Sequence, residues 1–133
     1  MPRKDLEKRK EYYNTYRAIH KTSLERYHAL WRAQHPEAVS NYARQNRVSL
    51  KLDVIAHYGR GGFPMCQWMN CREDDIDVLT IDHIDDDGAV RRKSGEKTGH
   101  NFYRWLRAQG YPEGFQTLCA NHQMKKELLR RRK

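Results

Sequence analysis

Apolar positions are scattered in the first third of the chain and form no broad aliphatic face. Up to residue 48 they are interspersed with charged and polar residues, so this part is a poor candidate for a core of its own. A 15-residue repeat, about four helical turns, runs through it at Tyr12, Tyr27 and Tyr42. The pattern predicts two or three helices, with breaks near Thr22, where a capping box begins, and near His35.

From residue 49 onward the apolar residues follow the periods of regular elements. Residues 49–58 carry them at helical spacing, with Ser49 suited to cap the helix and Gly59 to end it. We expect this helix to pack on the domain that follows. The predicted organisation is a basic helical arm, residues 1–48, and a C-terminal domain, residues 49–133.

The C-terminal domain contains two short runs of strand-forming residues. Residues 78–84 predict a first strand, ended by an Asp-Asp-Asp-Gly turn, and residues 115–118 predict its hairpin partner. The basic segment that follows, residues 121–132, predicts a helix. The fold class is therefore α+β.

The segment between the two strands predicts less regular structure. Residues 89–93 suit either an additional strand or an irregular basic arm. Asn101 suits the cap of a short helix over residues 102–109, which Gly110 ends.

Charge changes sign along the chain, and its total indicates a polyanionic partner. The net charge is +9, but residues 59–100 carry 6 Lys or Arg against 9 Asp or Glu, a net of −3, between two basic arms. Basic arms suit nucleic-acid phosphates, and an acidic centre suits a divalent cation. The alternatives are a basic protein without a specific partner and, for the N-terminal arm, a helical extension that is only solvated or that forms a homodimer.

The sequence predicts an intracellular protein that does not enter a membrane. It has no apolar run near the roughly 20 residues of a membrane span, and its N-terminus is a charged run instead of a signal peptide. Its 3 cysteines cannot all pair within one chain, so in a reducing compartment they suit metal binding.

Cysteine and histidine spacing predicts a zinc site. Cys66 and Cys71 are separated by four residues in a short polar loop, and Cys119 and His122 are separated by two residues before the last helix. Together they make the four ligands of a closed tetrahedral site. The alternative is a set of buried free cysteines.

These residues surround an Asp-His pair at the end of the first strand, and the whole arrangement resembles a known family. The resemblance rests on the cysteine pair, on Leu79-Thr80-Ile81-Asp82-His83-Ile84, and on Leu118-Cys119-Ala120-Asn121-His122. In this order they resemble the zinc-containing HNH endonucleases of the His-Me finger superfamily, often found in phages and mobile elements. The resemblance implies a ββα-metal finger with a structural zinc site, preceded here by the basic helical extension.

The resemblance also assigns roles. His83 would be the general base that activates a water molecule, which suits a side chain that titrates near neutral pH. Asp82 would hold a catalytic Mg²⁺ or Mn²⁺ ion, since hard cations prefer oxygen ligands. In an ideal strand these neighbours point to opposite faces, so both serve one site only if the strand bends or ends there.

This chain departs from the family pattern in two places. The middle Asn has no match near residues 114–117. Relatives carry Cys-x-x-Cys followed by His or Asn, whereas this chain reads Cys119-Ala120-Asn121-His122-Gln123. In one assignment His122 completes a zinc site of three cysteines and one histidine, and Gln123 binds the catalytic ion. In the other, His122 binds the catalytic ion, and zinc keeps only three cysteines or is absent. We favour the first assignment, and Asn121 is a further candidate for the ion.

The predicted function is a metal-dependent DNA endonuclease that nicks or cuts both strands. The basic residues assigned to nucleic-acid contact are Arg91, Arg92, Lys125, Lys126 and Arg130. The alternative is a zinc-stabilised nucleic-acid-binding protein without catalysis. An RNA nuclease would share the same chemistry.

Overall fold

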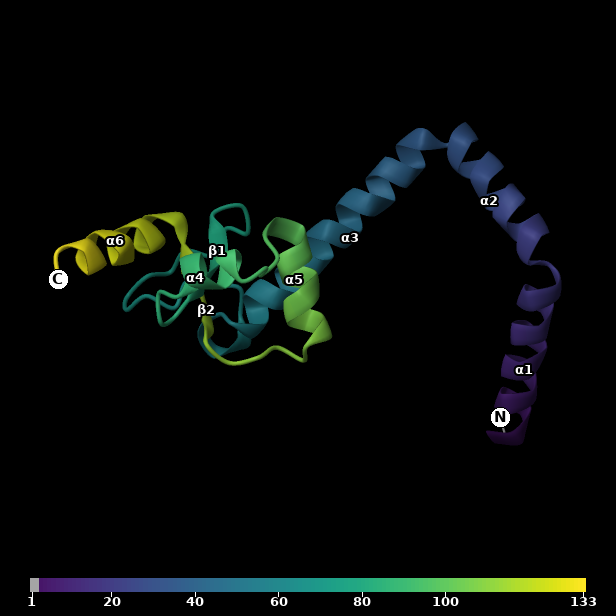
Figure 1. Ribbon diagram of the computed structural model, residues 1–133, viewed down its shortest axis with the longest axis horizontal. Coiled ribbons are helices and arrows are strands. Elements are labelled where there is room, and N and C mark those ends of the chain that lie inside the picture. The colour runs from purple at the N-terminus through teal and green to yellow at the C-terminus, as the bar shows by residue number, and fades with distance from the viewer. Residues whose placement is uncertain (1–2) are drawn as a thin grey trace. The chain divides into compact units, whose positions relative to one another are not determined.

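The computed structural model describes residues 3–133 and combines helices with one small sheet (Figure 1). The elements in chain order are α1 (Arg3–Ile19), α2 (Lys21–Gln34), α3 (Pro36–His57), η1 (Arg60–Gly62), β1 (Leu79–His83), α4 (Gly88–Lys93), α5 (Gly99–Ala108), β2 (Phe115–Cys119) and α6 (Ala120–Arg131). The predicted α+β class is confirmed. The chain divides into two compact units, residues 1–43 and 44–133, which are described separately.

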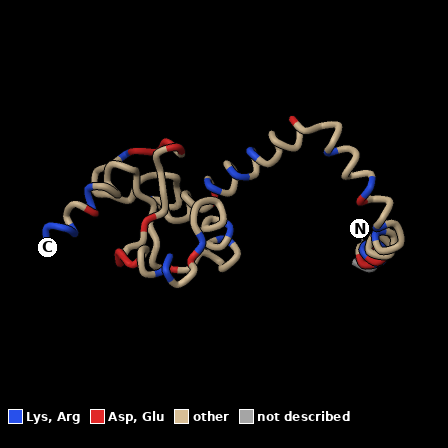
Figure 2. The backbone as a smooth tube through the Cα atoms, turned by 45° about the horizontal axis from the view of Figure 1, so that its top comes forward, with Lys and Arg blue, Asp and Glu red and all other residues tan. Residues whose placement is uncertain are grey.

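The first unit consists of α1, α2 and the start of α3, and its described side chains are almost entirely exposed. The predicted breaks occur at His20 and His35, and Pro36 begins α3 as a first-turn proline can. The predicted capping box at Thr22 does not form, because α2 already begins at Lys21 and has no side-chain cap. Basic residues recur along these helices (Figure 2). The unit lacks an apolar core, as its sequence pattern predicts.

The prediction of a separate helix that begins at Ser49 is wrong, because residues 49–57 form the C-terminal part of α3. No Gly or Pro interrupts this helix after Pro36, so nothing breaks its backbone hydrogen bonds near Ser49. The division between the two units falls inside the helix, between Ala43 and Arg44. The expectation that this segment packs on the C-terminal domain is met by Leu50, Val54 and Ile55, which are buried.

The core of the second unit forms between α3, the hairpin and α5. β1 and β2 are antiparallel, with Leu79 opposite Cys119 and His83 opposite Phe115. The amphipathic helix α5 adds its apolar side, Phe102 and Leu106. α6 follows β2 directly and leaves the sheet (Figure 1). The helix thus begins at the last residue of the sheet, which fixes the start of α6 against the start of β1.

The segment between the strands is more helical than expected. Residues 88–93 form α4, neither a strand nor an irregular arm. A carboxylate four residues before an arginine supports the helix, since Asp87 accepts a hydrogen bond from Nε of Arg91. α5 begins at Gly99 with Thr98 at its N-cap, so Asn101 lies inside the helix and does not cap it.

The structure gives no sign of a membrane-spanning helix. Within residues 3–133, each helix is too short or too polar to cross a bilayer.

Candidate functional site

Four metal-binding side chains gather where the two strands meet α6. Cys66 and Cys71 come from the loop before β1, Cys119 ends β2, and His122 lies in the first turn of α6. Their ligand atoms all lie within 4.8 Å of one another. Nδ1 of His122 is 3.1 Å from Sγ of Cys119 and 3.7 Å from Sγ of Cys66. The predicted clustering of these four residues is confirmed, and the cluster could bind a metal ion such as zinc.

The cluster is partly shielded from solvent, with Cys66 and Cys119 buried and Cys71 and His122 half-buried. Cys66 is fully buried, and its sulfur accepts a hydrogen bond from the backbone N–H of Cys119 at 3.3 Å. Burial raises the pKa of the Cys66 thiol to about 11. The Trp68 ring stacks on His122 with ring centres 4.9 Å apart. The donor set fits zinc, because a bound metal ion would supply the nearby positive charge that stabilises a buried thiolate.

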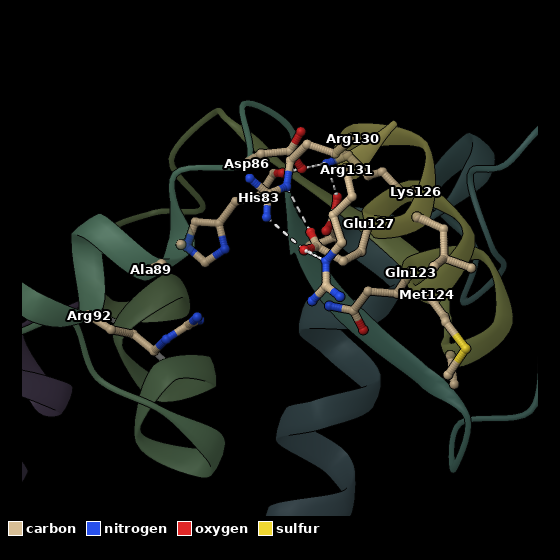
Figure 3. Close-up of a pocket in the computed structure, with 14 residues that line it drawn as sticks. His83, Asp86, Ala89, Arg92, Gln123, Met124, Lys126, Glu127, Arg130 and Arg131 are labelled. Atoms are coloured by element: carbon tan, nitrogen blue, oxygen red, sulfur yellow. Dashed lines mark hydrogen bonds and ion pairs between the residues drawn. The ribbon is translucent and has the colours of Figure 1, made fainter. Parts of the chain in front are cut away.

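A second group of polar side chains lies at the other end of β1. A pocket of about 660 Å³ opens there, lined by residues of β1, α4 and α6 (Figure 3). Asp82 and His83 both line it, although they are neighbours in a strand. β1 ends at His83, and a turn follows in which Asp86 has a positive φ of 57°. The predicted end of the strand therefore places both side chains at one pocket.

The His83 ring is held by a carboxylate. Its Nε2 lies 2.9 Å from Oε2 of Glu96, and both side chains are nearly buried, at 12% and 9% exposure. A carboxylate can only accept a hydrogen bond, so in the neutral imidazole Nε2 carries the proton and Nδ1 keeps its lone pair. The ring also stacks on Phe102, with centres 5.8 Å apart. These contacts fix both the tautomer and the plane of the ring.

A glycine lies against the free nitrogen of His83. A methyl group at Gly88 would come within 2.8 Å of Nδ1. The φ of Gly88 lies outside the left-handed region, so space alone requires glycine there. The first residue of α4 thus lies directly beside Nδ1, at a position where only a glycine fits without a shift of the ring.

Asp82 lies opposite Gln116 and is tied to two nitrogen donors. Its Oδ2 accepts hydrogen bonds from Nε2 of Gln116 at 2.9 Å and from Nζ of Lys126 at 2.6 Å. The Lys126 ammonium also lies 2.9 Å from Oδ1 of Asp86. Burial acts to lower the pKa of Lys126, but hydrogen bonds to Asp82 and Asp86 outweigh it and the pKa is raised. Gln116 occupies part of the segment in which the family pattern would place its Asn.

The second ligand predicted for the catalytic ion is engaged elsewhere. Gln123 lines the pocket, but its Oε1 accepts a hydrogen bond from Oγ1 of Thr80 at 2.8 Å. The oxygens that already surround a cation are those of Asp82 and Asp86 and the backbone oxygens of His83 and Ile84. Carboxylate and carbonyl oxygens fit a hard divalent cation. Asp82 and the turn after β1 therefore supply the oxygens that fit a divalent cation. Gln123 does not contribute an oxygen in its present position.

The predicted nucleic-acid residues divide between the pocket and its surroundings. Arg92 and Arg130 line the pocket (Figure 3), whereas Arg91 lies over the Phe115 ring, 5.3 Å from its centre. Lys125 is exposed and lies 5.8 Å from the centre of the Trp68 ring. Lys126 points inward to the carboxylates. The pocket therefore joins a histidine base to a basic rim.

Sequence reasoning missed Glu96 and Gln116 as partners of the two central residues. Glu96 lies in a segment that its composition describes only as an exposed loop, and no spacing relates it to His83. Gln116 was detectable in principle, because hairpin pairing places it opposite Asp82. Arg131, which also lines the pocket, lies in the predicted basic helix beside the residues that were named.

Comparisons of the chain with models of known protein families, with curated proteins and with solved structures found no match. The function is therefore inferred from the site itself.

Proposed function

We propose that this protein is a DNA endonuclease that hydrolyses phosphodiester bonds in the pocket between β1 and α6. The observation that carries the proposal is the His83–Glu96 pair at 2.9 Å, with the other ring nitrogen free at a pocket rimmed by arginines. A histidine held in one tautomer by a carboxylate is an arrangement for general-base catalysis. The fold would be a ββα-metal finger formed by β1, β2 and α6.

The residues would divide the reaction between them. Nδ1 of His83 would accept the proton of the attacking water, and Glu96 would stabilise the imidazolium that results. Arg92, Arg130 and Arg131 would bind the phosphate, since guanidinium groups donate paired hydrogen bonds to its oxygens. Arg130 and Arg131 also bind Glu127, which lowers the pKa of that carboxyl to about 2. A phosphate would compete with a fully ionised carboxylate for these two arginines.

A divalent cation at Asp82 and Asp86 would add charge stabilisation. Mg²⁺ or Mn²⁺ bound there would offset the negative charge that develops on the phosphate and the leaving oxygen. The oxygen ligands fit such an ion, as described above. Asp82 is 8% exposed, and its place on a strand holds it rigidly beside His83.

Zinc would act on the fold and not on the reaction. Its four ligands come from the loop before β1, from β2 and from α6, so one ion would join all parts of the finger. A four-coordinate site has no open position for a substrate. In a small, strongly polar unit such an ion would supply stability that the core does not.

The exposed arm would hold DNA. Residues 1–43 carry 9 Lys or Arg against 5 Asp or Glu, with their described aromatic rings exposed. These helices do not pack on a core of their own, so the phosphate backbone of DNA would be the surface that they contact. Dimerisation through the same helices would be the other use of this arm.

One observation favours a second candidate function, a zinc-stabilised nucleic-acid-binding protein without catalysis. The Asp82 carboxylate is paired with Lys126 and Gln116. In that case Asp82 would serve only to attach α6 to the hairpin.

The experiment that tests the proposal is nicking of supercoiled plasmid in Mg²⁺ or Mn²⁺. Wild type is compared with His83→Ala and with His100→Ala, an exposed histidine outside the pocket. We expect His83→Ala to lose at least a hundredfold in rate at unchanged zinc content, and His100→Ala to match wild type. Equal nicking rates for all three proteins would show that His83 takes no part in the reaction.

A further inference from the structure

The Lys126 ammonium is surrounded by four oxygen atoms at the end of β1. It lies 2.6 Å from Oδ2 of Asp82 and 2.9 Å from Oδ1 of Asp86. The backbone oxygens of His83 and Ile84 lie 2.7 Å and 3.2 Å from it. Lys126 reaches them from α6, and its side chain is 17% exposed. The strand end and its turn thus already form a cation site, and a nitrogen occupies it.

The charges in this oxygen cage are not balanced by Lys126 alone. Two carboxylates, of Asp82 and Asp86, face one ammonium, which leaves a net charge of about −1. An ammonium has three protons, so it cannot give a full hydrogen bond to four oxygens at once. Two carboxylates and two carbonyls are the ligand types of a hard divalent cation, whose +2 charge would balance the cage.

The Lys126 ammonium is also able to move away from these four oxygens. Its four-carbon stem is flexible, and its ammonium remains strongly attracted to water and to phosphate. The pocket of about 660 Å³ that it borders offers room, and Arg92, Arg130 and Arg131 line the same pocket (Figure 3). A phosphate bound by these arginines would attract the ammonium out of the cage.

We propose that Lys126 is a tethered competitor of the divalent cation, so that the ion enters the four-oxygen cage only when the lysine turns outward to a phosphate. The inference rests on the proposed function for the identity of that phosphate. It links the two ligands: DNA draws Lys126 out, and the vacated oxygens then bind the cation more tightly. By linkage, the cation increases the affinity for DNA by the same factor.

The test is a titration of the zinc-loaded protein with Mn²⁺ in the absence of DNA. Electron paramagnetic resonance measures the concentration of free Mn²⁺ at each step. Lys126→Met removes the competitor, and Lys125→Met is its matched control, one residue away, with the same charge loss, outside the pocket. We expect Lys126→Met to bind one Mn²⁺ at least tenfold more tightly than wild type. Lys125→Met should match wild type, and adding Asp86→Asn to Lys126→Met should remove the gain.

Two further measurements make the outcome decisive. A short duplex DNA should tighten Mn²⁺ binding by wild type but not by Lys126→Met, which has no lysine to draw out. If zinc-loaded Lys126→Met does not fold in buffer without Mn²⁺, Lys126→Gln, which keeps one donor for Asp82, is titrated instead. Equal Mn²⁺ affinity in the Lys126 and Lys125 variants would overturn the proposal. The titration without DNA does not depend on cleavage, so an inactive protein with the expected Mn²⁺ result would contradict only the nuclease.

Discussion

The two ends of the β1–β2 hairpin carry side chains of opposite character. At the Leu79–Cys119 end, three sulfurs and one imidazole form a partly buried cluster whose ligand atoms lie within 4.8 Å of one another. At the His83–Phe115 end, carboxylates, a histidine and arginines line an open pocket of about 660 Å³. Soft ligands in a four-coordinate site suit a structural ion, whereas an open site with a histidine and carboxylates suits a substrate. Under the proposed function, one end would stabilise the fold and the other would perform the chemistry.

A single helix connects the two ends. His122 belongs to the cluster, and Lys126, about one turn later on α6, contacts Asp82 at the pocket. Whatever fixes the start of α6 therefore also fixes one wall of the pocket. The structural and the chemical roles are separable by mutation only where a residue contacts one end alone.

The largest expected effect comes from the cluster. Cys66→Ser removes a buried zinc ligand, and structural zinc contributes on the order of 10 kcal/mol to folding, similar to the whole stability of a typical domain. We expect loss of zinc, loss of a cooperative unfolding transition by circular dichroism, and loss of nicking. A zinc-free Cys66→Ser protein with the melting temperature of wild type would contradict the structural role.

The next effect should be confined to the pocket. Glu96→Gln keeps a hydrogen-bond acceptor for Nε2 of His83 but removes the charge that stabilises an imidazolium. We expect kcat for nicking to fall about ten- to a hundredfold, the usual range for a displaced or unsupported base. Zinc content, melting temperature and DNA affinity should not change. Glu113→Gln, an exposed acid outside the pocket, is the control.

Much of both sites could be predicted from the sequence, for a physical reason that differs between them. Spacing in the chain fixes which cysteines and histidine meet, because a hairpin brings its two ends together. Asp82 and His83 were found because they end a strand that residue type alone indicates. The contact between Glu96 and His83 was not predicted, because Glu96 lies in the loop between α4 and α5. The position of that loop depends on how the two helices pack, and no periodic pattern in the sequence indicates it. Lys126 was assigned to phosphate because its neighbours are basic, and its carboxylate partners lie 40 or more residues away in sequence.

A smaller effect should follow from a methyl group beside the His83 ring. Gly88→Ala places that methyl within 2.8 Å of Nδ1, so the ring must shift away from its position. We expect about a tenfold fall in nicking rate, since small misplacements of a base are costly. The helix propensity of alanine should keep or slightly raise the melting temperature. A lower melting temperature with an unchanged rate would show that the ring has free space after all.

The smallest effect tests the core that supports both ends. Burial, with a smaller contribution from Tyr111, raises the pKa of Tyr58 to about 12 from an ordinary value of 10. Because the folded state keeps the proton longer than the unfolded state, the free energy of unfolding should be unaffected below pH 10 and should fall between pH 10 and 12.

Tyr58→Phe should remove that part of the pH dependence. The substitution should cost about 1 kcal/mol at neutral pH, because the hydroxyl donates a 2.6 Å hydrogen bond to the backbone oxygen of Pro112. Denaturant unfolding at several pH values measures both quantities. An identical fall above pH 10 in the two proteins would assign it to other tyrosines.

The central claim, that the pocket cleaves DNA and the cluster holds the fold, is tested most directly by measuring DNA binding and DNA nicking on the same zinc-loaded samples. We predict that wild type and His83→Ala bind DNA with the same Kd and carry the same zinc, and that only wild type nicks the plasmid in Mg²⁺ or Mn²⁺. Wild type that binds DNA, retains its zinc and leaves the plasmid intact with either ion would contradict the account and favour the binding protein.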